Sequence, residues 1–517
     1  MAENDRDTTV LVVGAGPTGM AAALVLIANG VPCRIIERRS GPSRSSRALG
    51  LQSRSMELLD EFGIAEQVEQ VAYRLSGASM MRGERELARL PWIPPSSRFP
   101  YTYVLPQAGL EDLLRQRLTE LGVTIETGEL MSATQDGTRV QVRLADGRSL
   151  TASWLIGADG ARSQVRTQLG IDFPGDDTGE TYYLADVVLD PGLPIGDSAM
   201  WLGPQGPLML MRLPGEERLW RVFADMTDTA RTSELPELTE DILIDLLHGR
   251  GPAGAQVERI DWTSTFRSRL RLAQTYRDRR AFLAGDAAHV FPPFGGQGMN
   301  LGIQDAVNLS WRISAVTRGA SPALLADYEA ERRPVAAATI ADVDARRRMY
   351  ALRHPVARLL RDLVLQLGGR SRRAAARGSL ANSQLATSYR TGRSLFQHGP
   401  LAGDRAPDAR YAGGRLHQQF GVDHYTLIAF GTGGLNLDDD RLVTITVDDH
   451  TDPAGAVRKV YRRTTGYILV RPDGYIASTG ADMSAARAQA DALLGPVGGR
   501  REKPAGAPAG DSGHTPR

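Results

Sequence analysis

Lysine and cysteine are almost missing from this chain of 517 residues. Its two lysines are Lys459 and Lys503, so lysine nucleophiles and Schiff bases are excluded from residues 1–458. The single cysteine, Cys33, cannot form an internal disulfide or a cysteine-based metal site, and its apolar surroundings indicate a buried thiol. Whatever chemistry the chain performs must therefore rest on other groups, and no metal site is predicted.

A charge excess and long hydrophobic runs are also lacking. The chain has 61 Lys and Arg against 60 Asp and Glu, so no overall field attracts nucleic acid or an anionic membrane. The start, MAENDRDTT, is polar and unlike a signal peptide, and no apolar run reaches membrane-spanning length. We expect a cytoplasmic protein, either a monomer or a homodimer, with no nucleic-acid or membrane partner.

A glycine-rich turn lies between an apolar strand over residues 10–13 and an alanine-rich helix over residues 20–28. A second strand, 33–36, delivers Glu37, which is followed by Arg38. The glycines allow a tight turn and close approach of a pyrophosphate, while the helix start offers free N–H groups and Glu37 accepts hydrogen bonds from an adenosine ribose. The unit predicts an adenine dinucleotide site, whose turn residues are Gly14, Gly16, Pro17, Thr18 and Gly19.

A second motif decides which dinucleotide binds. The segment AFLAGDAAHVFPPFGGQGMN puts Asp286 at a strand end, where its carboxylate would hold a ribityl hydroxyl. A loop rich in proline and glycine follows, and its Pro293, Gly295 and Gly296 are expected at the isoalloxazine ring. The next helix start would stabilise negative charge on the reduced ring. An NAD enzyme needs no such motif, so we predict non-covalently bound FAD, with this helix start contributing Gly298, Met299 and Asn300.

A third motif, LIGADGARSQVR, places Asp159 and Gly160 between a strand and a helix. In order and spacing, the three motifs resemble those of the class A flavoprotein monooxygenases, the para-hydroxybenzoate hydroxylase family, over about residues 8–390. The resemblance makes Asp159 and Gly160 cofactor residues. It also implies that Arg47, in SSRALGLQSRSMELLDEFG, contacts FAD and that Gln107, in VLPQAGLEDLL, approaches the flavin.

The resemblance implies a fold and its domains. The predicted class is α/β: a Rossmann-like FAD-binding domain, an inserted β-sheet substrate domain and a C-terminal thioredoxin-like domain, as in the family's larger members. No CxxC is present, so the last domain cannot do dithiol chemistry. The predicted boundaries are a disordered N-terminus over 1–7, the first FAD part over 8–179 (with 72–104 contributing to the substrate domain), the substrate domain over 180–270, the second FAD part with long helices over 271–398, the C-terminal domain over 399–497 and a disordered tail over 498–517.

The resemblance also implies a reaction. NADPH or NADH, bound transiently, reduces FAD, and O₂ forms a flavin C4a-hydroperoxide that hydroxylates an electron-rich aromatic ring. No catalytic side chain is assigned. His289, within a tight turn, is expected to be a packing residue rather than a general base. Arg162 and Arg166 would suit nicotinamide phosphates, although arginines in so arginine-rich a chain usually face solvent.

Large apolar residues in the middle domain favour a bulky planar substrate, a polycyclic phenol or quinone of the polyketide type used in antibiotic biosynthesis. A flavin halogenase, which LPWIPP (90–95) faintly suggests, is excluded because it needs a lysine in the flavin core. A Baeyer–Villiger oxygenase on the same scaffold stays open, and so does a non-catalytic FAD-binding redox sensor. The expected substrate residues are Trp201, Met209, Met211, Trp220 and Phe223.

Overall fold

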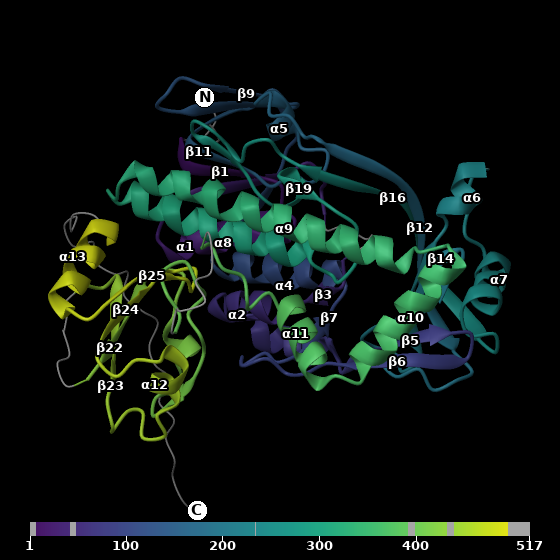
Figure 1. Ribbon diagram of the computed structural model, residues 1–517. Coiled ribbons are helices and arrows are strands. Elements are labelled where there is room, and N and C mark those ends of the chain that lie inside the picture. The colour runs from purple at the N-terminus through teal and green to yellow at the C-terminus, as the bar shows by residue number, and fades with distance from the viewer. Residues whose placement is uncertain (1–6, 42–47, 233, 391–398, 432–438, 495–517) are drawn as a thin grey trace, which may run out of the picture.

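A mostly parallel sheet carries the cofactor-type motifs (Figure 1). The computed structural model describes residues 7–41, 48–232, 234–390, 399–431 and 439–494. Neighbouring strands of the central path are parallel, so their carboxyl ends meet at one edge, where ligands bind in such sheets. The parallel strands, in spatial order, are β8 (Ile125–Thr127), β2 (Cys33–Glu37), β1 (Thr8–Val13), β11 (Ser149–Gly157) and β18 (Ala281–Leu283). Antiparallel additions are β17 (Arg277–Asp278), β10 (Val140–Leu144) and β9 (Leu130–Gln135).

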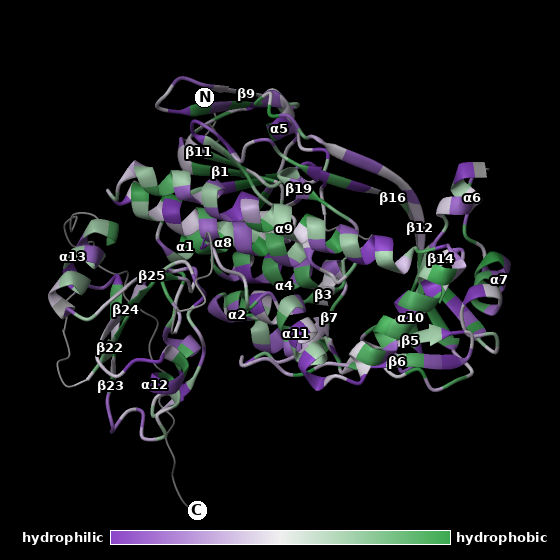
Figure 2. Cartoon of the chain, viewed as in Figure 1, coloured by the Kyte–Doolittle hydropathy of each residue, from purple (hydrophilic) through white to green (hydrophobic). Residues whose placement is uncertain are grey.

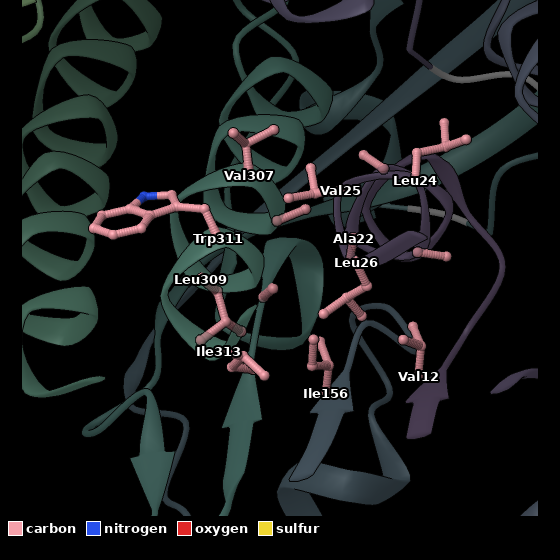
Figure 3. Packing of buried hydrophobic residues seen from close by; sticks show 14 of the residues in the cluster. Val12, Ala22, Leu24, Val25, Leu26, Ile156, Val307, Leu309, Trp311 and Ile313 are labelled. Atoms are coloured by element: carbon pink, nitrogen blue, oxygen red, sulfur yellow. The ribbon is translucent and has the colours of Figure 1, made fainter. Parts of the chain in front are cut away.

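Two helices, α1 (Pro17–Ala28) and α8 (Gly298–Thr317), pack together against this sheet. A Cβ added at Gly302 of α8 would lie 2.4 Å from Oγ1 of Thr18, so glycine allows the helices to approach closely. Apolar side chains of α1 and α8 fill the space next to Val12 and Ile156 of the sheet (Figure 3). β1 and β11 are hydrophobic along most of their length, as expected for strands covered on both faces (Figure 2).

A second, largely antiparallel sheet extends to one side of the molecule (Figure 1). The long strands β12 (Gly175–Asp190) and β16 (Gln256–Leu272) connect it to the cofactor part. Two of its strands, β5 and β6, come from the segment 72–104 that we assigned to the substrate domain. The remaining strands are β19 (His289–Val290), β15 (Leu219–Asp225), β14 (Gly206–Arg212), β13 (Ser198–Gly203), β5 (Gly77–Arg82) and β6 (Arg85–Pro91).

Long helices follow α8 within the predicted second FAD part, 271–398. α9 (Ala326–Tyr350) runs across the molecule, α10 (Pro355–Gly369) packs against β6 of the second sheet, and α11 (Arg372–Asn382) leads back toward the centre of the molecule (Figure 1). Among the residues described, no helix combines the length and apolarity needed to cross a membrane. The other helices are α2 (Ser53–Glu61), α3 (Ala65–Val71), α4 (Gln107–Glu120), α5 (Gln164–Gln168), α6 (Thr227–Thr232) and α7 (Glu240–Arg250). A small sheet comprises β3 (Gly50–Leu51), β7 (Thr102–Val104) and β4 (Tyr73–Leu75).

The C-terminal part has its own sheet and core. Strand β24 is antiparallel to both of its neighbours, while β22 and β23 are parallel. This order is compatible with a thioredoxin-like unit, which stays a prediction, whereas the mixed α/β class of the whole chain is confirmed. The predicted tail, 498–517, and nearly all of segment 1–7 lie outside the described residues. The elements are β23 (Leu442–Val447), β22 (Tyr425–Phe430), β24 (Gly466–Val470), β25 (Ile476–Gly480), α12 (Ala456–Tyr461) and α13 (Met483–Leu494), with the hairpin β20 (Arg410–Tyr411) and β21 (Gly414–Arg415).

Candidate active site

The turn between β1 and α1 opens into a cavity. Gly14, Gly16, Pro17 and Thr18 line it. No atom lies within 4 Å of a Cβ added at Gly16, so the space beside this backbone is open to a ligand next to the N-terminus of α1. Gly19 does not line the cavity; a Cβ there would lie 1.9 Å from the carbonyl oxygen of Gly14, which makes this glycine a packing requirement.

Glu37 stands at the end of β2 and faces the same turn. Its Oε2 accepts a hydrogen bond of 2.9 Å from the backbone N–H of Ala15, and its Oε1 accepts from the backbone and side chain of Arg39, both at 3.1 Å. Burial opposes ionisation of Glu37, but these hydrogen bonds outweigh it and lower its pKa. Glu37 is thus an ionised acceptor in the cavity wall, beside Arg38. Arg47 lies outside the described residues.

Asp159 and Gly160 follow β11 and also line the cavity. The Asp159 carboxylate accepts hydrogen bonds from the backbone N–H groups of Gln164 and Val165, at 2.7 and 3.1 Å, and from the Ser163 hydroxyl at 2.5 Å. Burial raises the pKa of Asp159 despite these bonds. The carboxylate therefore holds the start of α5, and the part of this motif left open to a ligand is the backbone around Gly160, where an added Cβ meets nothing within 4 Å.

Asp286 and the loop after it form a further part of the wall. Asp286 follows β18 in a short 3-10 turn, is exposed, and lines the cavity. Pro293, Gly295, Gly296, Gly298 and Met299 line it as well. Gly295 and Gly296 have φ values of +87° and +62°, a conformation in which side chains are strained, so the glycines are needed for the path of this loop.

Asn300 is not in the cavity wall; its amide positions the loop instead. Its Nδ2 donates to the carbonyl oxygens of Gly50 (2.7 Å) and Gly296 (2.6 Å), and its Oδ1 accepts from the backbone N–H of Gln52 (2.8 Å). These bonds occupy the Asn300 side chain, so its expected contact with FAD stays a prediction for its backbone N–H in the first turn of α8. Gln52 was missed by the sequence analysis: it lines the cavity and donates from Nε2 to the carbonyl oxygen of Gly295 at 3.2 Å.

The motifs surround a single continuous cavity of about 1180 Å³. Pockets for one drug-sized ligand have roughly 300–1,000 Å³, so this cavity has room for a dinucleotide and a second ligand. Gln107, at the start of α4, lines it and donates to Glu111 at 2.8 Å. The residues present fit FAD: an open glycine backbone, an ionised acceptor beside it and a loop with two adjacent glycines, Gly295 and Gly296, line the same cavity. In the described part of the chain, no cluster of His, Cys, Asp and Glu suits a metal.

The second sheet supplies the apolar end of the cavity. On one face of β13, β14 and β15, Met200, Met209 and Phe223 are cross-strand neighbours, and all three line the cavity together with Met211. Phe223 stacks on Tyr182 with ring centroids 4.7 Å apart and contacts Phe294 edge-on at 5.5 Å. The structure thus brings three of the five expected substrate residues, Met209, Met211 and Phe223, to the cavity.

Trp201 and Trp220 are on the opposite face of the same strands. Both are buried in a separate core with Leu208 and Leu210, and neither lines the cavity. Trp201 donates from Nε1 to the carbonyl oxygen of Gly83 at 2.9 Å. Because side chains alternate along a strand, these tryptophans cannot share a face with Met209 and Phe223. We therefore remove both from the expected substrate site.

His289 and Arg166 are structural, whereas Arg162 is exposed in the cavity wall. The His289 ring is buried, and its Nε2 lies 2.6 Å from Oδ2 of Asp305. Arg166 was expected to face solvent, but it is buried. It donates to the carbonyl oxygens of Ala287 (2.8 Å) and Ala161 (3.0 Å), and its guanidinium carbon lies 3.9 Å from the Phe173 ring centroid. It ties the second motif to the third.

Two further residues of the cavity wall, Arg221 and Arg346, were not predicted from the sequence as site residues. Arg346 of α9 donates to Oδ1 of Asn382 at 2.6 Å, and its Nη1 would lie 3.1 Å from a Cβ added at Gly295. It stands in the run Arg346–Arg348, which offers no pattern to distinguish it from a solvated helix face. Arg221 could have been found, because strand alternation places it on the face of Phe223.

Comparison with known proteins identifies the fold and cofactor. Residues 7–343 match the family described as FAD binding domain. The chain belongs to this family. It is 35% identical to 6-methylpretetramide 4-monooxygenase of Streptomyces rimosus over 513 residues, covering 91% of this chain and 90% of the relative.

Solved structures of the same FAD-binding fold cover nearly the whole chain. OxyS anhydrotetracycline hydroxylase from Streptomyces rimosus superimposes with a TM-score of 0.78 at 30% identity, covering 95% of this chain and 100% of OxyS. Diels-Alderase PyrE3, of the pyrroindomycin pathway, has a TM-score of 0.72 at 26% identity and covers 95% and 100%. The FAD-binding family and the named relatives confirm an FAD-dependent enzyme of the class A monooxygenase type.

Proposed function

We propose that this enzyme hydroxylates a polycyclic aromatic substrate of the polyketide type, using FAD, NADPH or NADH, and O₂. The observation that carries the proposal is the single cavity, in which the FAD motifs continue into a wall of Met200, Met209 and Phe223. Such a wall suits a large planar ring system. Relatives and neighbours named for 6-methylpretetramide and anhydrotetracycline support this substrate class. We also propose a cytoplasmic location and either a monomer or a homodimer.

Each part of the wall has its own task in this proposal. Gly16, Glu37 and Asp286, which line the cavity, would hold the dinucleotide, and the Pro293–Gly296 loop would contact the flavin ring. When bound, FAD supplies the redox and oxygen chemistry. The chain's own residues would bind both ligands, orient the aromatic ring over the flavin loop and keep water from it, because the substrate wall consists mainly of methionine and phenylalanine side chains. NADPH or NADH would enter transiently, with the exposed Arg162 as a candidate phosphate contact.

A second reaction class must be distinguished, because PyrE3, a neighbour of the same fold, is named a Diels-Alderase. Baeyer–Villiger insertion and a non-catalytic sensor are also compatible with bound FAD. The discriminating observations are whether a reductant bleaches the flavin, and whether oxygen from O₂ enters the product.

The test is anaerobic stopped-flow reduction of the holoenzyme flavin by NADPH, with and without anhydrotetracycline. We expect the ligand to accelerate reduction, and isotopically labelled O₂ to introduce one labelled hydroxyl group. A labelled ring-expanded ester would indicate Baeyer–Villiger insertion instead. Fast reduction without ligand, or turnover without labelled oxygen, would contradict the proposal.

A further inference from the structure

Arg221 is a buried arginine in the substrate wall. It lies on β15 in a cross-strand row with Met211 of β14 and Asp186 of β12, one row away from Phe223. Its side chain is 1% exposed and contributes to the cavity lining. In the described part of the chain, strands β12 to β15 contribute one charged side chain to this wall, that of Arg221. A ligand would therefore find its strongest hydrogen-bond donor on these strands at Arg221.

The hydrogen bonds of Arg221 are incomplete. Nε and Nη2 both donate to the Asp186 carboxylate, the latter at 2.8 Å, and the guanidinium carbon stacks 4.8 Å from the Trp262 ring centroid. Nη1 is buried and has no hydrogen-bond partner. An unsatisfied buried donor is costly. Because the Arg221 side chain contributes to the cavity lining, a ligand can supply the missing acceptor. The cross-strand neighbour Met211 is half-buried and unbranched, so it can change rotamer to admit such a group.

The charge of the pair restricts what that group is. The Asp186 carboxylate already balances the guanidinium, so an anionic oxygen would introduce an uncompensated charge into a buried place. A neutral carbonyl oxygen accepts the free N–H at no such cost. We propose that Nη1 of Arg221 donates a hydrogen bond to a neutral ketone or quinone oxygen of the polycyclic substrate, and that Asp186 sets the preference for a neutral acceptor. This deepens the proposed function and rests on it for the nature of the ring system.

The test compares two probes of the same shape, fluorenone and fluorene, which differ by one carbonyl group. Binding to the oxidised holoenzyme without NADPH is measured by quenching of tryptophan fluorescence. We expect fluorenone to bind about tenfold more tightly, as one hydrogen bond to a charged donor provides. The infrared carbonyl stretch of bound fluorenone should shift to lower frequency. Because no turnover is involved, failure here is distinguishable from failure of the proposed hydroxylation.

Variants locate the effect. Arg221→Met combined with Asp186→Leu removes donor and counter-charge together, which avoids a buried lone carboxylate and should abolish both the tenfold preference and the infrared shift. Arg212→Met is the matched control: Arg212 also stacks 4.8 Å from a tryptophan ring, that of Trp220, but is on the opposite face of the sheet and outside the cavity lining. It should change neither readout.

Asp186→Asn keeps the donor and removes its counter-charge. The preference for fluorenone over fluorene should remain, while fluorene carboxylate should gain about tenfold in affinity over its binding to the unmodified enzyme. Equal binding of fluorenone and fluorene by the unmodified enzyme, an unshifted carbonyl stretch, or an unchanged preference in the Arg221→Met/Asp186→Leu variant would overturn the inference.

Discussion

At the scale of single residues, the three glycines of the first motif are required for different physical reasons. Gly14 has φ +104°, and a Cβ there would lie 2.3 Å from the carbonyl oxygen of Ala158. Gly19 is needed for packing against Gly14. Gly16 has an ordinary φ of −76° and open space around it. The folded backbone therefore has no room for a side chain at Gly14 or Gly19, whereas a side chain at Gly16 would obstruct only the ligand.

This difference predicts the phenotype of Gly16→Val. The free protein should fold with nearly unchanged stability, because the new side chain meets no protein atom, while FAD should bind at least about tenfold more weakly because the side chain occupies the space beside the helix N-terminus. Stability is measured by urea unfolding of the flavin-free protein and affinity by flavin fluorescence. Gly249→Val, at an equally open position on α7 away from the cavity, is the control. Full flavin affinity in Gly16→Val would contradict the cofactor placement.

At the scale of elements, the sequence predicted where strands and motifs lie better than it predicted which face of the sheet each side chain is on. Each FAD motif was recognisable because glycine, acidic residue and strand end occur at close spacing. Substrate residues were instead chosen by size along 201–223, which mixed both faces of three strands. Trp201 pairs in register with Leu208, whereas Met209 pairs with Phe223. The alternation alone would have separated them, but which face meets the cofactor depends on how the two sheets pack, and no local pattern encodes that.

Substitutions on the two faces of this sheet should affect different properties, stability on one face and substrate binding on the other. Trp201→Phe should lower the free energy of unfolding by about 1–3 kcal/mol, since it removes buried atoms and leaves the Gly83 carbonyl without its donor. It should leave KM for an accepted aromatic substrate unchanged. Met209→Ala should raise KM several-fold. Urea unfolding and steady-state kinetics check both variants, and a large change of KM in Trp201→Phe would return that tryptophan to the substrate site.

At the scale of the whole molecule, an ion pair and a buried hydrogen bond join the C-terminal part to the FAD-binding part. Arg471 donates to Glu331 of α9 at 2.6 Å, and Asp473 accepts from Asn308 of α8 at 3.0 Å. These contacts could not be predicted from the sequence, because the partners are more than a hundred residues apart and runs of arginine resemble a solvated surface. The predicted domain boundary at residue 399 gave no sign of these buried contacts between the two parts.

The same interface buries a histidine in a charged cluster. His417 lies with its Nε2 3.4 Å from Glu57 and 3.5 Å from Arg54, and its backbone N–H donates to Asp408. Burial lowers the pKa of His417 from 6.5 to about 4, with Arg405 and Arg54 adding to the effect against the carboxylates. Burial opposes ionisation of Glu57 too, but Arg405, His417 and Arg54 outweigh it and lower its pKa to about 2.

These shifts predict a loss of stability in mild acid. As the pH falls from 6.5 to 4, the unfolded chain protonates His417 before the folded protein does, so the free energy of unfolding falls by roughly 3 kcal/mol at about 1.4 kcal/mol per pKa unit. Glu57 adds a further loss below pH 4.5, its ordinary pKa. His417→Gln should flatten the dependence between pH 6.5 and 4.5, because glutamine takes up no proton. Urea unfolding at pH 6.5 and at pH 4.5 tests this, with a His354→Gln variant at an exposed histidine as the control. A slope in His417→Gln equal to that of the unmodified protein would show that the acid sensitivity arises elsewhere in the molecule.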